Sequence, residues 1–306
     1  MRLCAISVDL DEIPNYWAIH GLDPAQGSGR GLTAVYDVAV GRLLDLAEED
    51  RIPLTLFAIG SDLARTENAE TLRAAHVRGH EIANHTLDHR YDLTRLGHDD
   101  MAHQIEGGIA AIAHAVGEPP VGFRAPGYTI TDEVFDLLQQ IGVQYDSSVF
   151  PCPAYWAMKA SAISLYKARG RESRSIVDNP NVLRAPTRPY FVGRPYYKRG
   201  TGMLELPVQV TPKLRLQFIG TTVTMAGPTG AKKLAEMCVG EPLVNLELHG
   251  IGVLDERDGL DELAPHQIDV RIARERKLAA IRAVVSVLRD NGYSFVTMRD
   301  AASKFV

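Results

Sequence analysis

Aspartate and histidine side chains at two places in the sequence have the types and spacing of a metal site. In the stretch HEIANHTLDH, residues 80–89, His85 and His89 stand four positions apart. On a helical turn this spacing would place both imidazoles on one face, as in other metal sites. In SVDLDE, Asp9 and Asp11 alternate with Leu10, so an extended backbone would point both carboxylates the same way. Two like charges that close are unfavourable unless a cation shares them.

Two imidazoles and one carboxylate leave positions on a metal ion open, as a catalytic site requires. The acidic pair could therefore supply one ligand and one base. Asp88, between the two histidines, could orient one imidazole. The same residues also fit simpler interpretations: a solvated loop at Asp9 and Asp11, ordinary surface or core histidines at 85 and 89, and a surface aspartate at 88.

Other reactive groups complete a possible hydrolytic site. Arg124, in FRAPGY, follows an apolar run, and an ion pair with Asp9 or Asp146 would tune the base. The Pro-Gly pair after it predicts a tight turn that can present a backbone N–H to a developing oxyanion. His249, in LELHG, is a candidate acid for a leaving amine, although a satisfied core histidine fits that position equally well.

The elements that carry these residues alternate between strand and helix. Short apolar runs predict strands, and runs with helical period predict helices. Strands are expected over 3–9, 52–60, 80–85, 120–127, 143–149, 203–210, 243–250 and 293–301, and helices over 33–50, 68–79, 99–117, 131–142 and 269–292. About seven such repeats favour a parallel sheet with helices outside, closed or nearly closed into a barrel. The reactive residues lie at the carboxyl ends of the strands, where α/β barrels collect catalytic groups.

Two segments break this alternation. Residues 151–200 are rich in proline and aromatic residues and contain the basic run KARGRESR, which we interpret as a loop insertion over one face of the barrel. A Gly-rich loop is expected over 21–31. We therefore predict one domain over residues 1–306, with the insertion as part of it.

Composition and charge exclude several classes of function. The chain has 306 residues, 45% of them hydrophobic, and a formal net charge of -5, which gives no electrostatic case for binding nucleic acid or an anionic membrane. Three widely spaced cysteines do not form a disulfide framework and suit a reducing compartment. No run approaches the roughly 18 apolar residues of a membrane span, and the first apolar run is too short for a secretion signal. We therefore expect a cytoplasmic protein.

Five motifs occur in the order found in the polysaccharide deacetylase superfamily, whose NodB-like domain defines carbohydrate esterase family 4. They are SVDLDE, NHTLDH, FRAPGY, DSSVF and LELHG, and the resemblance runs from about residue 3 to about residue 300. It implies a deformed (β/α) barrel with seven or eight parallel strands. It also implies a metal-dependent hydrolase, with zinc as the metal and cobalt or nickel as alternatives.

Carried over residue by residue, the resemblance assigns each motif a role. Asp11, His85 and His89 resemble the metal ligands, and Asp9 resembles the catalytic base. Arg124 resembles the residue that fixes the base, Tyr128 the oxyanion donor through its backbone N–H, and His249 the general acid. Asp146, at the end of a predicted strand, is a further candidate that could support either Arg124 or His249.

The first motif departs from that of the usual secreted members, which have two adjacent aspartates. In this chain Leu10 separates the two aspartates. This form of the motif resembles that of a subgroup that includes peptidoglycan-deacetylase-like and allantoinase-like intracellular enzymes. The implied reaction is removal of an N-acetyl or N-formyl group from an amino sugar that is free, lipid-linked or polymeric. The alternatives are hydrolysis of a small cyclic amide or ureide, and a non-catalytic carbohydrate-binding barrel. A homo-oligomer is compatible with the sequence.

Overall fold

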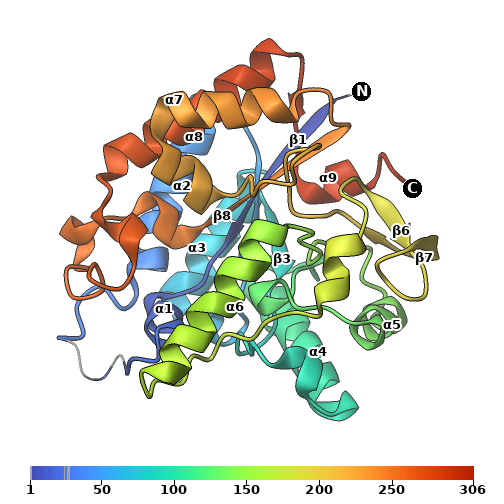
Figure 1. The fold of residues 1–306 in the computed structure, drawn as a ribbon, viewed down its shortest axis with the longest axis horizontal. Coiled ribbons are helices and arrows are strands. Elements are labelled where there is room, and N and C mark those ends of the chain that lie inside the picture. Colours follow the sequence, from blue (N-terminus) through green and yellow to red (C-terminus); the bar gives the residue numbers. More distant parts are fainter. Residues whose placement is uncertain (1, 24, 26–27) are drawn as a thin grey trace.

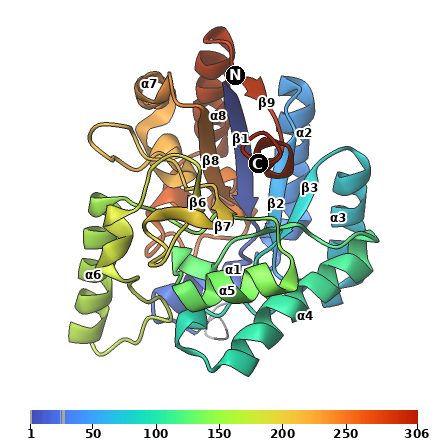
Figure 2. The ribbon, with the colours of Figure 1, turned by 90° about the vertical axis from the view of Figure 1, so that its right-hand side faces the viewer.

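A computed structural model describes residues 2–23, 25 and 28–306, and shows one curled sheet with helices packed outside it (Figures 1 and 2). The predicted loop over 21–31 therefore lies partly outside the described residues. Within them the strands are β1 (Leu3–Asp9), β2 (Leu54–Ala58), β3 (Glu81–Asn84), β4 (Gly122–Phe123), β5 (Tyr145–Asp146), β6 (Tyr190–Val192), β7 (Arg199–Glu205), β8 (Leu243–His249) and β9 (Ser294–Phe295).

The sheet has the order β6-β7-β5-β4-β3-β2-β1-β8, with β9 beside β1. Every strand pair is parallel except β6–β7, which is antiparallel. The predicted α/β fold with a deformed barrel of parallel strands is confirmed as a curled, mostly parallel sheet, and β6 is the antiparallel exception at one edge.

Residues 206–210 lie between the two ends of this sheet. The Val208 N–H donates to Val149 O (3.0 Å), and the Gln209 N–H donates to Asn245 O in β8 (3.1 Å). The Asn245 side-chain amide also donates to the carbonyls of Leu206 and Pro207. An irregular segment and one buried amide thus join the two halves of the curled sheet.

The helices pack around the sheet and bury its outer face. They are α1 (Ile13–Ile19), α2 (Val40–Asp50), α3 (Thr66–Val77), α4 (His98–Val116), α5 (Asp132–Ile141), α6 (Pro153–Ala168), α7 (Gly220–Cys238), α8 (Arg274–Asp290) and α9 (Met298–Ala302). Helices α7 and α8 lie side by side on one flank, and α4 and α5 lie together on another (Figure 2). The apolar side chains of β1 that point outward, Cys4, Ile6 and Val8, join the largest core cluster together with Leu10, which follows the strand.

Several predicted elements need correction. The interval 151–200, expected to be loops, contains the 16-residue helix α6 and strand β6. Helix α7 was not predicted, and Gly227 interrupts it with φ 65° just before Pro228. The strand expected over 293–301 pairs only through β9, because the Thr297 hydroxyl then accepts from the Asp300 N–H and begins α9.

Two glycines in the middle of α4 allow this helix to approach the loop that follows β3. A Cβ atom on Gly108 would lie 2.2 Å from Asn84 Oδ1 and 2.8 Å from the Thr86 carbonyl carbon. A Cβ atom on Gly107 would lie 2.8 Å from Leu87 Cδ2. The glycines lower helix propensity by about 1 kcal/mol each, but they make room for the backbone that carries His85 and His89.

Cys4, Cys152 and Cys238 are buried free thiols. Within the described ranges, no helix has both the length and the apolar character needed to cross a membrane.

Candidate active site

The carboxyl ends of β1, β3 and β8 bring the predicted reactive residues together. Side chains alternate along a strand, so Ser7 and Asp9 of β1 face the inside of the curled sheet while Val8 faces the helices. The pairing of β1 with β8 places Asp9 directly beside His249. The proximity expected for these residues therefore follows from the register of two parallel strands.

Asp11, His85 and His89 form a compact buried group. Asp11 Oδ1 lies 3.4 Å from His85 Nε2 and 3.2 Å from His89 Nε2. The two imidazole rings have centroids 4.8 Å apart. One potential ligand atom from each of the three residues lies within 4.8 Å of the others.

The histidine pair lies on a loop, and the predicted helical turn is wrong. Thr86 and His89 have positive φ angles of 70° and 51°. The Asn84 side-chain oxygen accepts from the Thr86 N–H, and the Thr86 hydroxyl accepts from the His89 N–H. These contacts fold the chain back on itself, so that the two imidazoles converge on Asp11 without helical backbone.

The polar atoms of this group fit a divalent cation. Asp11 Oδ1 and both ring nitrogens of His89 are buried without a hydrogen-bond partner among the described residues. Orphaned buried polar atoms of this kind are unfavourable unless a ligand satisfies them. His85 Nδ1 lies 2.7 Å from the Arg124 carbonyl oxygen, so an Nδ1–H donor there leaves Nε2 as an acceptor facing Asp11.

The charges of Asp11 and His89 are consistent with that interpretation, whereas burial of His85 is outweighed by Asp9 and Asp11, which raise the pKa of this imidazole. Burial acts to raise the pKa of Asp11, but the two imidazoles outweigh it and hold this pKa well below the usual value. Burial lowers the pKa of His89 in spite of Asp11, which favours the neutral imidazole that a metal ligand requires.

Arg124 is fully buried and holds Asp9. Its Nη1 donates to Asp9 Oδ1 (2.6 Å), and its other donors reach the Ser7 hydroxyl and the hydroxyl and carbonyl of Ser147. Its guanidinium lies over the Phe57 ring, 4.1 Å from the centroid. Of the two carboxylates considered from the sequence, Asp9 is thus the one that pairs with Arg124.

His249 is held by a carboxylate that sequence reasoning missed. Its Nδ1 lies 2.7 Å from Oε1 of Glu247, which is fully buried, while its Nε2 lies 3.9 Å from Asp11 Oδ2. Burial disfavours the imidazolium, but the Glu247 carboxylate, helped by Asp11 and Asp9, raises the pKa of His249 to about 10. The signal for Glu247 was present in LELHG, because residues two apart in a strand share a face.

Asp146 and Asp88 have other partners than those considered from the sequence. Asp146 accepts hydrogen bonds from the N–H and the hydroxyl of Ser148, whose oxygen in turn accepts from the Ala125 N–H. Within the described part of the chain, Asp146 makes no hydrogen bond to Arg124 or His249. Asp88 accepts from Gln104 Nε2 at 2.8 Å.

Tyr128 lies in the expected turn, close to the acid candidate. Gly127 and Tyr128 have positive φ angles of 61° and 59°. The Tyr128 N–H donates to Ala125 O at 3.1 Å within this turn. The Tyr128 ring packs edge-on against His249, with centroids 6.5 Å apart.

Aromatic side chains line the surroundings of the site. The Tyr155 ring from α6 packs against that of Tyr128 (5.7 Å), Tyr16 of α1 approaches His249 (6.4 Å), and Tyr91 packs edge-on against His89 (4.7 Å). Helix α6 lies across the front of the molecule near α1 (Figure 1). The aromatic-rich segment is therefore helical where it approaches the site, and it contributes Tyr155 from α6.

Comparisons with known proteins show similarity to polysaccharide deacetylases. The family model described as polysaccharide deacetylase matches residues 34–145. A chitooligosaccharide deacetylase from Sinorhizobium fredii is 32% identical over 125 residues, covering 38% of this chain and 57% of the relative. A peptidoglycan deacetylase from Helicobacter pylori is 26% identical over 148 residues, covering 48% and 49%. The chain spans about half the length of these curated relatives.

Solved structures extend the likeness of fold over nearly the whole chain. A structure from Mycobacterium smegmatis described as a polysaccharide deacetylase has a TM-score of 0.61 and 20% identity, and the match covers 99% of this chain and 90% of the other. A similarly described structure from Pseudomonas aeruginosa has a TM-score of 0.59 and 17% identity, with coverage of 99% and 90%. The similarity of sequence to polysaccharide deacetylases thus covers residues 34–145, and the similarity of fold covers nearly the whole chain.

Proposed function

We propose that this protein is a metal-dependent hydrolase that removes an N-acetyl or N-formyl group from a free, lipid-linked or polymeric amino sugar. The match of residues 34–145 to the polysaccharide deacetylase family supports the reaction class. The observation that carries the proposal is the buried Asp11–His85–His89 group beside Asp9 and His249. Among the described residues, Asp11 Oδ1 and both ring nitrogens of His89 have no hydrogen-bond partner.

Asp11, His85 and His89 would hold the divalent ion. One carboxylate and two imidazoles suit zinc and leave open positions, and cobalt and nickel accept similar donors. The bound ion would supply Lewis-acid polarisation and a lowered water pKa. The roles proposed for Asp9, His249 and Tyr128 rest on the contacts that these residues make.

Asp9 is suited to take the proton from the attacking water. Its Oδ1 is occupied by Arg124, while its Oδ2 lies 3.9 Å from His85 Nε2 and so faces the metal-binding group. The buried guanidinium fixes the orientation of the carboxylate. As water attacks the acyl carbon, this free oxygen accepts the proton.

His249 and Tyr128 would act on the other side of the scissile bond. His249 Nε2 points to the site, and the proton favoured by Glu247 can pass to the departing amine. The Tyr128 N–H would donate to the developing oxyanion, sharing the donor now directed at Ala125 O. One such donor is typically worth about 3 kcal/mol in the transition state.

Release of acetate or formate from N-acylated amino sugars by the metal-loaded protein tests this proposal. We expect Asp9→Asn and His249→Gln each to lower kcat by about 10²- to 10⁴-fold with the metal content unchanged. His98→Ala serves as the control, because His98 is exposed at the start of α4. Near-normal turnover in both site variants would contradict the assignment. If the protein hydrolysed cyclic amides or ureides but no N-acylated amino sugar, the same residues would act on a different class of substrate.

A further inference from the structure

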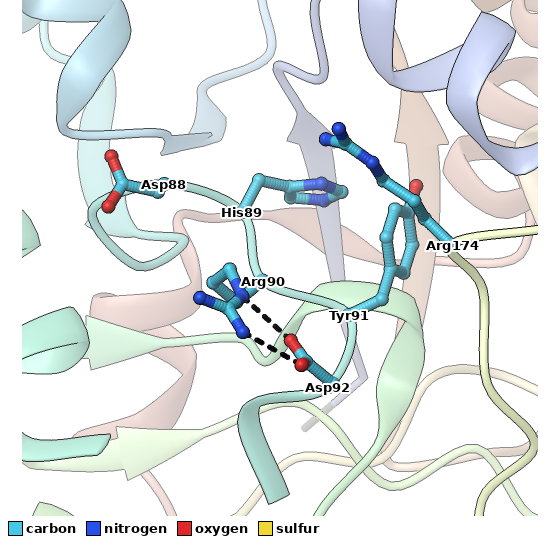
Figure 3. Close-up of a pocket in the computed structure, with 6 residues that line it drawn as sticks. All are labelled: Asp88, His89, Arg90, Tyr91, Asp92 and Arg174. Carbon is cyan, nitrogen blue, oxygen red and sulfur yellow. Dashed lines mark hydrogen bonds and ion pairs between the residues drawn. The ribbon is translucent and has the colours of Figure 1, made fainter. Parts of the chain in front are cut away.

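A pocket of about 420 Å³ opens directly beside the metal-binding group. It is lined by five consecutive residues of the histidine loop and by one residue from the segment after α6; they are Asp88, His89, Arg90, Tyr91, Asp92 and Arg174 (Figure 3). The pocket includes His89, so a substituent bound here would belong to the molecule whose amide lies at the metal-binding group.

Arg174 has no acidic partner in this pocket. The guanidinium of Arg90 is held by the Asp92 carboxylate through two hydrogen bonds of 2.8 Å. Asp88 lies on the far side, away from Arg174 (Figure 3), where it accepts from Gln104. Among the described residues no carboxylate forms an ion pair with Arg174, and the four residues outside this range, Met1, Pro24, Gln26 and Gly27, have no acidic side chain.

The backbone at Arg174 is fixed against α1. The Arg174 N–H donates to Ala18 O (3.2 Å), and the Ser173 hydroxyl donates to Ile19 O (2.6 Å). From this anchored position the side chain extends across the pocket towards His89, beside the Tyr91 ring (Figure 3). Helix α1 follows Asp11 almost directly in the chain, so the segment that carries Arg174 is tied to the same region as the metal ligands.

We propose that Arg174 binds an anionic substituent of the substrate, a carboxylate or a phosphate, and thereby selects acidic N-acyl amino sugars over neutral ones. This inference rests on the proposed function, because it assumes that the acyl group lies beside Asp11, His85 and His89. The planar guanidinium presents paired donors that match both kinds of anion. The Tyr91 ring beside it offers an apolar surface for a sugar ring.

Calorimetric binding of three probes to the metal-loaded protein tests the role of Arg174 without turnover. The probes are N-acetylglucosamine, its 6-phosphate, and N-acetylmuramic acid, which carries a carboxylate. We expect at least one anionic probe to bind ~10- to 100-fold more tightly than the neutral sugar. Arg174→Gln should abolish this preference, and Arg174→Lys should retain part of it. Arg169→Gln, the same charge change at an exposed position that ends α6, should leave the preference intact.

The outcomes distinguish the source of the anion and separate this inference from the proposed function. Tighter binding of the phosphate or of the carboxylate identifies which group Arg174 prefers. Equal affinities for all three probes, no binding of either anion, or an unchanged preference in Arg174→Gln would overturn the inference. An Arg174-dependent preference without any release of acid product would support the anion site and contradict the proposed hydrolysis instead.

Discussion

Glu247 and His249 share the inner face of β8 because they stand two residues apart in an extended strand. The contact between Glu247 Oε1 and His249 Nδ1 leaves Nε2 of the imidazole directed at the site. A carboxylate in this position orients the ring and stabilises its charged form, as in other acid–base pairs.

Replacing Glu247 by Gln should remove the negative charge while keeping a polar group of the same shape. We expect kcat for deacylation to fall on the order of 10²-fold, because the imidazolium of His249 loses its counter-charge and its orientation. Steady-state kinetics with the metal-loaded protein measures this effect. Metal content should remain that of the wild type if Asp11, His85 and His89 hold the ion and the second possible group, Asp9, Glu247 and His249, does not. A kcat within about twofold of the wild type would show that Glu247 does not support catalysis.

The sequence predicted the individual contacts unevenly. Asp9 and Asp11 were expected to lie near the histidine pair because all four residues follow strands of one parallel sheet, and the structure brings them together. The support of His249 was missed because a glutamate inside an apolar strand gives no spacing signal beyond its alternation. The backbone of the histidine loop was mispredicted because four-residue spacing suits both a helical turn and a folded loop.

Helix α4 shows how a weak helical sequence can serve the site. Gly107 and Gly108 lower the propensity of the helix, but the loop that carries the histidines packs against them. At an open helical position, replacing glycine by alanine normally stabilises the protein by about 1 kcal/mol. At Gly108 the new methyl group would meet backbone atoms that cannot easily move.

Gly108→Ala should therefore lower the free energy of unfolding by about 1–3 kcal/mol, as is typical of overpacking, and should also weaken metal binding. Gly41→Ala is the matched control, because nothing lies within 4 Å of a Cβ atom at this position in α2. That variant should be neutral or more stable by up to about 1 kcal/mol. Urea denaturation and metal titration provide both measurements. Equal effects of the two substitutions would argue against a close approach of α4 to the loop.

His20, which follows α1, joins Tyr166 of α6 to Gln267 through two hydrogen bonds. With His20 Nε2–H donating to Gln267 Oε1, Nδ1 accepts from the Tyr166 hydroxyl, both at 2.8 Å. Burial, together with the nearby His266, lowers the pKa of His20 in spite of the Gln267 contact. The neutral imidazole is therefore the form that this arrangement favours.

The contribution of His20 to stability should be complete above its unfolded pKa of about 6.5 and should be lost as the pH falls through the lower folded value. Between these values the unfolded state binds more protons, so stability rises with pH. Hydrogen exchange of the α6 amides, corrected for intrinsic rates, should show faster opening on the acid side of this window. His20→Gln should remove this pH dependence. Persistence of the same dependence in the variant would assign it to another group.

The predicted helices that agree best with the structure have clear apolar periodicity and clear sequence signals at their ends. The α5 helix begins where the Thr131 hydroxyl accepts from the Val134 N–H and ends at Gly142, as its sequence indicated. By contrast, α6 has no buried residue and lies in a stretch rich in proline and aromatic residues, so its sequence lacks the apolar stripe that predicts a packed helix. Helix α7 was not predicted because Gly227 and Pro228 interrupt the helical pattern of its sequence.

The molecule as a whole brings together ligands that are distant in the chain. Asp11 follows β1, whereas His85 and His89 follow β3, and β2 lies between these strands in the sheet. The parallel sheet that makes this possible was predicted from alternating elements. The closure through residues 206–210 was not, because it depends on the buried side-chain amide of Asn245. A metal ion bound to Asp11, His85 and His89 would link the two strand ends directly and stabilise the folded state.

The metal content of the purified protein, measured beside that of His85→Ala and His98→Ala, is the most direct test of this site. We predict one divalent ion per chain in the wild type and in His98→Ala, and essentially none in His85→Ala. The exposed His98 controls for the loss of a histidine, and circular dichroism of each variant controls for folding. Retention of a full equivalent of metal by folded His85→Ala, or a wild type that takes up neither zinc nor cobalt, would contradict the proposed metal site.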